Sequence, residues 1–262
     1  MKVFCDIGNT QTKIILLENK KPKFKIISTK NFYEFYSKYR NSYFYISCVV
    51  KEIENLISKT KKMVKFISYK DLSNYIKIKY DKKNLGSDRI LSAFVGKNFF
   101  GKDFLIISFG TAIVLDYVDK CGCYVGGEIF PGFNPLAQTL FVSTSKLPFL
   151  KIKNFFYLDN LIGHSTHECI YKGILNFCVS GILNFLKEVR PKNVILTGGD
   201  KEIFLTNFYQ KVKSIKMHKF DNIVLFGILL WCYYSEIIDK EELKNSFKLE
   251  IFGRDIDFNK II

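Results

Sequence analysis

The chain opens with Val3-Phe4-Cys5-Asp6-Ile7-Gly8-Asn9-Thr10, in which a short apolar strand pattern runs into a polar turn with glycine. A second strand pattern, Ile106-Ile107, runs into the comparable turn Ser108-Phe109-Gly110-Thr111. Two more strand patterns follow each turn, and helical periodicity dominates after them. These later strand patterns are Ile14–Leu17, Phe24–Ile27, Ala112–Val118 and Tyr124–Ile129. We infer that the sequence contains an internal duplication.

The duplication predicts two α/β domains, residues 1–102 and residues 103–262. A period of about 100 residues is far longer than the repeats of solenoid proteins, so each copy should be a domain in its own right. Two such domains would leave a cleft between them, and both glycine turns would face it. Clefts between domains are favoured ligand sites.

The composition is that of a soluble globular protein. The chain has 262 residues, of which 48% are hydrophobic and 25% charged. No apolar run approaches the roughly 20 residues that a membrane-spanning helix needs. Asp6 interrupts the apolar start of the chain, so no signal-peptide core is expected. We therefore expect a cytoplasmic protein without a membrane partner.

The formal net charge of +15 raises the question of nucleic-acid binding. Only four of the 40 basic residues are arginines, namely Arg40, Arg89, Arg190 and Arg254. Bidentate recognition of phosphates and bases favours arginine, and the lysines here are scattered along the chain. We expect no nucleic-acid partner.

The cysteines and histidines give no metal-binding pattern. The seven cysteines include one Cys121-Gly122-Cys123 motif but no second pair at zinc spacing. Most of the others lie in apolar stretches, which favours buried, reduced thiols. His164 and His167 lie near Glu168 without a third ligand at suitable spacing, so we expect structural or surface histidines.

The first turn carries groups that can bind an anion. Glycine at position 8 lets a backbone approach a phosphate closely, while hydroxyls and the Lys13 ammonium can contact its oxygens. Asp6 at the strand end can hold a hydrated Mg²⁺ that travels with a nucleotide. The alternative is an ordinary hairpin turn, because Asp, Asn and Gly are common turn residues. The second glycine turn makes the functional interpretation the stronger one.

Gly86-Ser87-Asp88-Arg89 precedes a helical pattern that runs to about Phe99. A carboxylate beside a guanidinium can act as a general base next to an anion clamp. The alternative is a helix cap with a solvated arginine. Another stretch, Gly96–Asp103, resembles a P-loop but ends in an aspartate and lies between a helix and a strand, the reverse of the P-loop order.

Several of these motifs, in this order and spacing, together resemble the type III pantothenate kinase family over nearly the whole chain. They are Asp6–Lys13, Gly86–Arg89, Gly110-Thr111-Ala112, Gly126–Gly132 and Gly163–Thr166, with Gly173 in the helix that follows. The resemblance implies two duplicated actin/hexokinase-like (ribonuclease H-like) α/β domains around a central cleft. It also implies a homodimer that phosphorylates pantothenate with ATP, the first step toward coenzyme A.

The resemblance implies a role for each matching residue. Asp88 would accept the proton of the pantothenate hydroxyl, and Thr111 would contact ATP from the second domain. Tyr80 matches a substrate-contacting tyrosine, although its spacing to Gly86 differs by one residue. The residues implied for ATP and its Mg²⁺ are Asp6, Ile7, Gly8, Asn9, Thr10, Gln11, Thr12 and Lys13, and those for pantothenate are Gly86, Ser87, Asp88, Arg89, Thr166 and Tyr80.

One position departs from the family pattern. Ser108 stands where the family usually has an aspartate that ligates an activating monovalent cation, K⁺ or NH₄⁺. A neutral hydroxyl is a much poorer ligand for such a cation than a carboxylate, so we assign no metal-binding residue. Two other functions remain open: a non-catalytic nucleotide-binding regulator of the same fold, and a kinase of another small alcohol.

Overall fold

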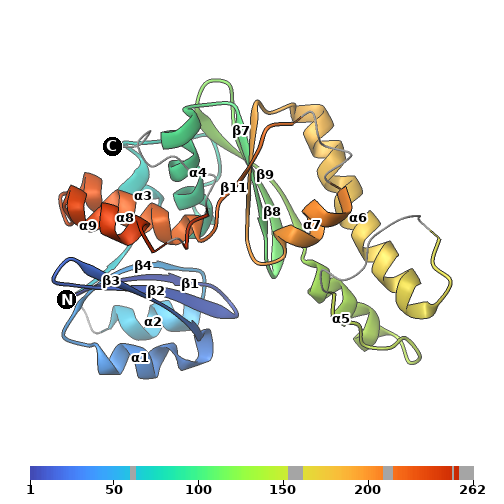
Figure 1. Ribbon diagram of the computed structural model, residues 1–262, viewed down its shortest axis with the longest axis horizontal. Helices are drawn as coiled ribbons and strands as arrows, with labels where there is room; N and C mark the ends of the chain where they lie inside the picture. The colour runs from blue at the N-terminus through green and yellow to red at the C-terminus, as the bar shows by residue number, and fades with distance from the viewer. Residues whose placement is uncertain (60–62, 153–161, 209–214, 250, 254–262) are drawn as a thin grey trace. The chain divides into compact units, whose positions relative to one another are not determined.

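The computed structural model describes residues 1–59, 63–152, 162–208, 215–249 and 251–253 (Figure 1). By its contacts the chain forms two compact units. The first unit contains Met1–Lys102, Tyr117–Gly126 and Lys219–Ile262, and the second contains Asp103–Asp116 and Gly127–His218. The division into domains 1–102 and 103–262 stays a prediction, because contacts group residues by packing whereas duplication concerns their order along the chain.

The strand order repeats between the two sheets. One sheet has the order β3-β2-β1-β4-β5, and the other has the order β11-β10-β7-β8-β9-β6. Read from its β9 strand, the second sheet gives β9-β8-β7-β10-β11, which is the first order again with β6 added at the edge. In both, the glycine-turn strand pairs in parallel with a later strand, β1 with β4 and β7 with β10. The predicted α/β fold with duplicated architecture is confirmed.

The strands of the first sheet agree closely with the sequence patterns. Their bounds are β1 (Lys2–Ile7), β2 (Gln11–Glu18), β3 (Lys21–Ser28), β4 (Tyr43–Cys48) and β5 (Val64–Phe66). The turn between β2 and β3 is Asn19-Lys20, with φ of 48° and 62°. Pro22 lies within β3, which is an edge strand and can accommodate a residue without an N–H.

Alternation along β1 places its side chains on two faces of the sheet. Val3, Cys5 and Ile7 form a core with α1 (Phe32–Lys38) and α2 (Lys51–Ser58). The other face, which includes Asp6, lies toward α8 (Ile223–Tyr234), which packs on β1 and β4. Figure 1 shows α1 and α2 on one side of this sheet and α8 on the other.

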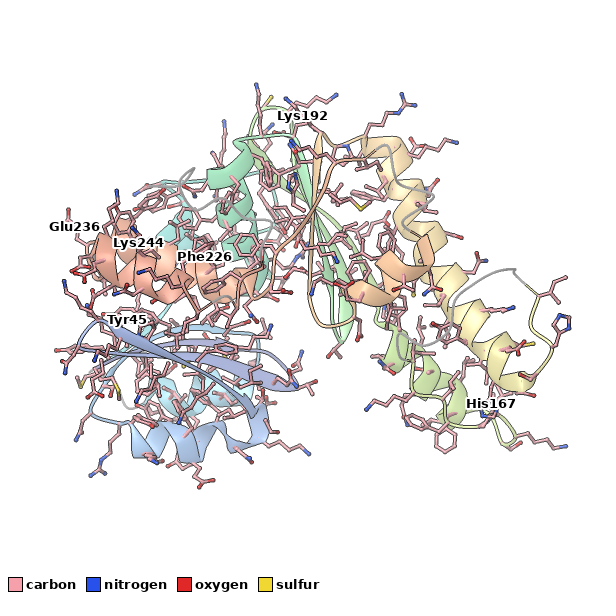
Figure 2. The ribbon with its side chains drawn as sticks, viewed as in Figure 1. Tyr45, His167, Lys192, Phe226, Glu236 and Lys244 are labelled. Carbon is pink, nitrogen blue, oxygen red and sulfur yellow. The ribbon has the colours of Figure 1, made fainter. Side chains whose placement is uncertain are left out.

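Helix α8 is apolar on all its faces and is a core helix of the first unit. Its residues from Leu225 to Cys232 are almost fully buried, against α4 (Ser87–Phe100) among other elements. The Phe226 ring (Figure 2) contacts four other rings, those of Phe99, Phe220, Phe247 and Phe252. This helix is therefore covered by its own unit.

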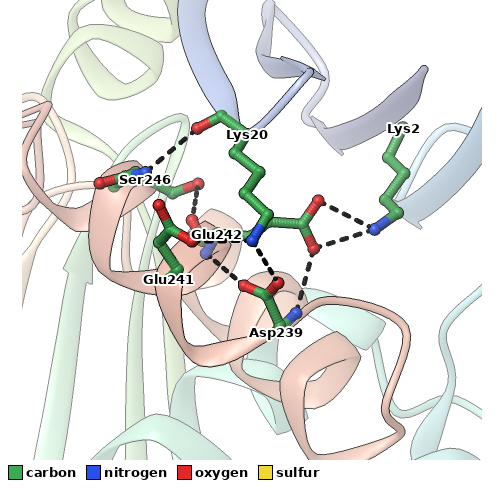
Figure 3. Close-up of polar contacts among 7 residues, drawn as sticks. Lys2, Lys20, Asp239, Glu241, Glu242 and Ser246 are labelled. Carbon is green, nitrogen blue, oxygen red and sulfur yellow. Dashed lines mark hydrogen bonds and ion pairs between the residues drawn. The ribbon is translucent and has the colours of Figure 1, made fainter.

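A polar cluster joins α9 (Lys240–Phe247) to the first sheet (Figure 3). Lys2 Nζ lies 3.1 and 3.0 Å from the two carboxylate oxygens of Glu242. Lys20 Nζ lies 3.0 Å from Asp239 Oδ2 and 2.7 Å from Glu241 Oε2. Because Lys20 is in the β2–β3 turn, these ion pairs hold the C-terminal helix against the N-terminal hairpin.

The second unit is built on strands β7 (Phe104–Phe109) and β10 (Asn193–Thr197), whose residues are almost all buried. The Phe109 ring stacks with Phe133 of α5 (Phe133–Ser143) and with Phe204 of α7 (Lys201–Phe208). Helix α5 packs on α6 (Thr166–Val189). The remaining strands of this sheet are β8 (Ala112–Val118), β9 (Cys123–Pro131), β11 (Met217–Lys219) and β6 (Lys77–Ile78).

Helix α6 is long and apolar enough to span a membrane, the one such helix among the described residues. Half of its most apolar stretch is buried inside the protein, as in a core helix of a soluble protein. Its hydropathy therefore indicates no membrane protein. The short elements that sequence periodicity did not predict are η1 (Thr29–Asn31), α3 (Tyr69–Leu72), α7, α9, β6 and β11.

Candidate active site

The first glycine turn, Asp6–Lys13, connects β1 to β2. The Gly8 N–H donates to the Gln11 carbonyl at 3.1 Å, which closes the turn. The Thr29 hydroxyl donates to the Gly8 carbonyl at 2.7 Å and lies 3.1 Å from the buried Thr12 hydroxyl. These contacts from Thr29 of η1 stabilise the conformation of the turn. Asn9, Thr10 and Gln11 are exposed at its tip.

Asp6 is the acidic group of this turn. It pairs with Lys13 across the β1–β2 ladder and with Ser47 across β1 and β4. Burial raises the pKa of Asp6 to about 6; Lys13 lowers this pKa, and the nearby Asp88 raises it. The charge of Asp88 is therefore near enough to Asp6 to affect its titration. That Asp6 and Asp88 share a site stays a prediction.

The start of α4 brings Asp88 to this position. Gly86 caps the helix, and the Asp88 Oδ1 atom accepts the Arg89 N–H at 2.8 Å. A side chain at position 86 would overlap the Asp88 carboxylate, which explains the glycine there. The Ser87 hydroxyl lies 2.8 Å from that of Ser47, the β4 residue paired with Asp6. This bond fixes the first turn of α4 to the carboxyl ends of β1 and β4, where Asp6 lies.

Arg89 extends the site toward Tyr80. Its Nη1 atom donates to the Tyr80 hydroxyl at 3.3 Å, and its guanidinium carbon lies 5.2 Å from the centre of the Tyr80 ring. Both residues are partly exposed. The structure thus brings Tyr80 to the Gly86–Arg89 motif despite the spacing that differs by one residue.

The second glycine turn, Ser108–Ala112, connects β7 to β8. The Gly110 N–H donates to the Ala112 carbonyl at 3.1 Å, and the Gly132 N–H donates to the Thr111 carbonyl at 2.9 Å. A side chain at Gly132 would overlap the Gly110 and Thr111 carbonyls. The backbone between β9 and α5 therefore packs directly against this turn and fixes the position of Thr111.

A neighbouring turn was given no functional role from the sequence. Thr197-Gly198-Gly199-Asp200 follows β10, and a side chain at Gly198 would overlap the Phe109 backbone. Gly198 has a φ of +92°, which strongly favours glycine. The signal was the glycine pair directly after a buried strand. Burial raises the pKa of Asp200 at the end of this turn.

Thr166 is the first residue of α6 and is exposed in the second unit. Ser165 caps the helix by accepting the Glu168 N–H, and Glu168 in turn accepts the His164 N–H at 2.8 Å. His164 and His167 are both exposed, in agreement with the expectation of structural or surface histidines. Figure 2 labels His167. Among the described residues no cluster of three His, Cys, Asp or Glu side chains could hold a metal ion.

The cysteines are all free. Cys5, Cys178 and Cys232 are buried, as expected for most cysteines outside the Cys121-Gly122-Cys123 motif, and Cys123 of that motif is buried as well. Cys121 and Cys169 are exposed, so the expectation of burial is wrong for Cys169, which lies in the first turn of α6 on its solvent side.

Solved structures with the same architecture define the class. A Campylobacter jejuni protein described as a candidate Baf family transcriptional activator superposes with a TM-score of 0.62 and 18% identity, covering 90% of this chain and all of its own. A Listeria monocytogenes protein described as a candidate N-acetylmannosamine kinase has a TM-score of 0.52 and 14% identity, covering 90% of this chain and 99% of its own. The repeated strand order and these neighbours place the chain in the actin/hexokinase-like class of α/β proteins.

Sequence comparison narrows the class to one family. The profile of the family described as type III pantothenate kinase matches residues 2–188. The type III pantothenate kinase of Thermosipho melanesiensis is 33% identical over 229 residues, which is 78% of this chain and 90% of the relative. The type III pantothenate kinase of a Sulfurihydrogenibium species is 33% identical over 231 residues, which is also 78% of this chain and 90% of the relative. The chain belongs to the type III pantothenate kinase family.

Proposed function

We propose that this chain transfers the γ-phosphoryl group of ATP to the primary hydroxyl of pantothenate, the first step of coenzyme A biosynthesis, in the cytoplasm. Family membership supports the reaction. The observation that carries the assignment of the site is the bond between the Ser87 and Ser47 hydroxyls, which joins the start of α4 to the strand ends that carry Asp6. Arg89 and Tyr80 lie beside Asp88 at this helix start. One carboxylate lies on the glycine turn and the other at a helix start, which suits a nucleotide side and an acceptor side.

The nucleotide side is the first glycine turn. Its exposed tip offers backbone N–H groups and hydroxyls, and Lys13 offers an ammonium beside Asp6. Thr111 of the second glycine turn would also contact ATP. These contacts would hold the phosphates in line with the acceptor, and positioning of this kind supplies much of the rate of phosphoryl transfer.

The Mg²⁺ that accompanies ATP in kinases suits Asp6. Asp6 is a half-buried carboxylate whose pKa is raised by burial and by Asp88, so a nearby cation would favour its ionised form. When bound, Mg²⁺ neutralises charge on the phosphates. A monovalent cation is doubtful here, because Ser108 offers a hydroxyl at the position where the family resemblance implies an aspartate.

The acceptor side is the start of α4. Asp88 would accept the proton of the attacking hydroxyl, which is general-base catalysis. The Arg89 guanidinium suits the pantothenate carboxylate, because its planar donors match that group in geometry and charge. Gly86 and Ser87 would line the same site, since Gly86 lets the Asp88 carboxylate fold back over the helix start.

In a homodimer, the second unit would form the interface between the two copies. Helices α5 and α6 and the segments beside them expose large apolar side chains there, whereas α8 is buried in the first unit. Two of these side chains, Phe141 and Phe149, are in ring contact, and exposed apolar side chains that lie together favour an interaction surface. The exposed residues are Ile129, Phe141, Val142, Phe149, Ile162 and Phe177. Thr166 begins α6, so it would reach pantothenate near this interface.

The test is phosphoryl transfer by the purified protein with ATP, Mg²⁺ and pantothenate, with and without K⁺ or NH₄⁺. We expect ADP and phosphopantothenate in equal amounts. Product formed only with another small alcohol would reassign the substrate. No product with any acceptor, despite ATP binding, would favour a nucleotide-binding regulator of the same fold.

A further inference from the structure

The contact between Arg89 and Tyr80 depends on how the Tyr80 ring is held. The ring meets Tyr124 of β9 edge-on, with 5.7 Å between ring centres and 76° between ring planes. Its hydroxyl accepts from Arg89 Nη1 at 3.3 Å. Tyr80 thus lies between β9 and the guanidinium that we assign to the substrate carboxylate.

The Tyr80 ring also lies directly on the backbone of Gly126 in β9. A Cβ at position 126 would come within 2.5 Å of Tyr80 Cδ2 and 2.7 Å of Cε2. Real Cβ atoms essentially never approach other heavy atoms so closely, and a ring held from two sides has little room to give. Gly126 also has a φ of +89°, which L side chains rarely adopt.

We propose that Gly126 is a positioning residue for the acceptor site: the absence of a side chain there sets the place of the Tyr80 ring, and the ring sets the Arg89 guanidinium for the substrate carboxylate. The inference rests on the proposed function and adds a residue to which that function assigned no role. Bidentate recognition of a carboxylate depends on the orientation of the guanidinium plane. A displaced Tyr80 would therefore weaken binding of the acid substrate.

The competing explanation is that Gly126 is needed only for its backbone conformation. Gly122 of the same β8–β9 hairpin separates the two explanations. It has a φ of +75°, but a Cβ there would approach only the Gly101 carbonyl at 3.3 Å and the Lys102 and Lys97 side chains at 3.8 Å or more. Gly122→Ala thus carries similar backbone strain in the same hairpin without touching Tyr80.

The kinetic test compares Gly126→Ala with Gly122→Ala. We expect Gly126→Ala to raise the KM for pantothenate roughly tenfold, the scale of one charge-assisted hydrogen bond. The KM for ATP and kcat should stay within about twofold, since the orientation of Arg89 serves only acceptor binding. Gly122→Ala should leave all three constants near those of the wild type. An equal rise in the pantothenate KM for Gly122→Ala would overturn the proposal.

A double-mutant cycle tests the route through the ring. In a Tyr80→Leu background, Gly126→Ala should add less than about twofold to the pantothenate KM, because the ring that it displaces is gone. A full tenfold addition in that background would overturn the proposal. If Gly126→Ala alone fails to fold, recovery of a cooperative unfolding transition in the double variant supports the overlap, and its absence contradicts it.

A measurement without substrate separates this inference from the proposed function. With 3-fluorotyrosine in the full chain, the ¹⁹F resonance that Tyr80→Phe removes belongs to residue 80. Gly126→Ala should shift that resonance and Gly122→Ala should not. If the wild type fails to phosphorylate pantothenate while this shift is seen, the proposed function falls and the contact of Gly126 with Tyr80 stands. An unshifted resonance overturns the positioning role even if the kinase activity is found.

Discussion

The two glycine turns occupy matching places in the two sheets but carry different chemistry. The first turn has Asp6 two residues before its glycine, whereas the second has Ser108 at the corresponding position. Asp6 is coupled electrostatically to Asp88 and Lys13. The second turn is instead enclosed by backbone, because Gly132 and Gly198 pack against it so closely that side chains there would overlap it.

The difference indicates that the two turns have different roles, although they occupy matching places in the duplicated fold. A charged turn beside a second carboxylate suits the metal-bound phosphates and the proton transfer. A turn enclosed by glycine backbone suits close contact with a neutral or anionic part of the nucleotide. The strand order was retained in both copies, and the side chains at the turns were not. Variants that change one turn or its partners test whether the roles differ.

Loss of the Asp88 carboxylate should have the largest effect. Asp88→Asn keeps the size of the side chain and removes the proton acceptor, so we expect kcat to fall roughly 10²- to 10⁴-fold while the variant still unfolds in one cooperative transition. Asp81→Asn is the matched control. Asp81 is an exposed carboxylate in the loop before α4, where it accepts hydrogen bonds from the Lys83 N–H and the Asn84 side chain. Near-normal kcat for Asp88→Asn would remove Asp88 from the role of general base.

Much of this arrangement followed from the sequence, and the reasons are physical. Apolar runs that end in glycine turns predicted β1, β2, β7 and β8, because buried strands and tight turns leave local patterns. The Gly86–Arg89 helix start was visible for the same reason. Contacts between distant segments leave no such local pattern: the Ser47–Ser87 bond and the packing of Tyr80 on Gly126 appear only in the fold. Helix α8 does have a local signal, because apolarity on all faces of a helix indicates burial, and the fold buries it.

Removal of the Asp6 charge should give the next largest effect. We expect Asp6→Asn to lower kcat/KM for ATP roughly 10- to 100-fold, the scale of a lost charged contact. The same variant should be more stable at pH 7 by about 1–3 kcal/mol, because the ionised carboxylate is disfavoured by burial and by Asp88. Chemical denaturation at pH 7 measures the gain. A less stable variant would contradict the assigned cause of the raised pKa.

The pH dependence of stability checks the same coupling. The pKa of Asp6 is about 6 in the folded chain against 3.8 ordinarily, so between these values the folded state binds more protons than the unfolded state. This group therefore makes the free energy of unfolding fall as pH rises from about 4 to 6. Asp6→Asn should remove that contribution, and Asp88→Asn should move it to lower pH, since Asp88 raises the pKa of Asp6. Denaturation curves across this range report both.

Giving the second turn a carboxylate should have a smaller effect. Ser108→Asp should make turnover respond to K⁺ by about three- to tenfold, equivalent to about 0.7–1.4 kcal/mol. Wild-type turnover should change less than about twofold when K⁺ replaces a large organic cation, because a hydroxyl is a weak ligand. Ser108→Asn supplies a neutral side chain of similar size and should behave as the wild type does. Strong K⁺ activation of the wild type would show that a carboxylate at this turn is not required.

The smallest effect should come from the ion pairs that hold α9 to the first sheet (Figure 3). Lys2 and Glu242 are partly buried, with 30% and 13% of their side chains exposed, whereas Lys20 and its partners are about half exposed. Lys2→Met should therefore lower the free energy of unfolding by about 1 kcal/mol, and Lys20→Met should lower it less, because water screens exposed charges. Turnover at saturating substrate should be unchanged in both, since Lys2 lies at the opposite end of β1 from Asp6. If Lys20→Met is the more destabilising variant, the hairpin contact rather than the half-buried pair holds the C-terminal helix in place.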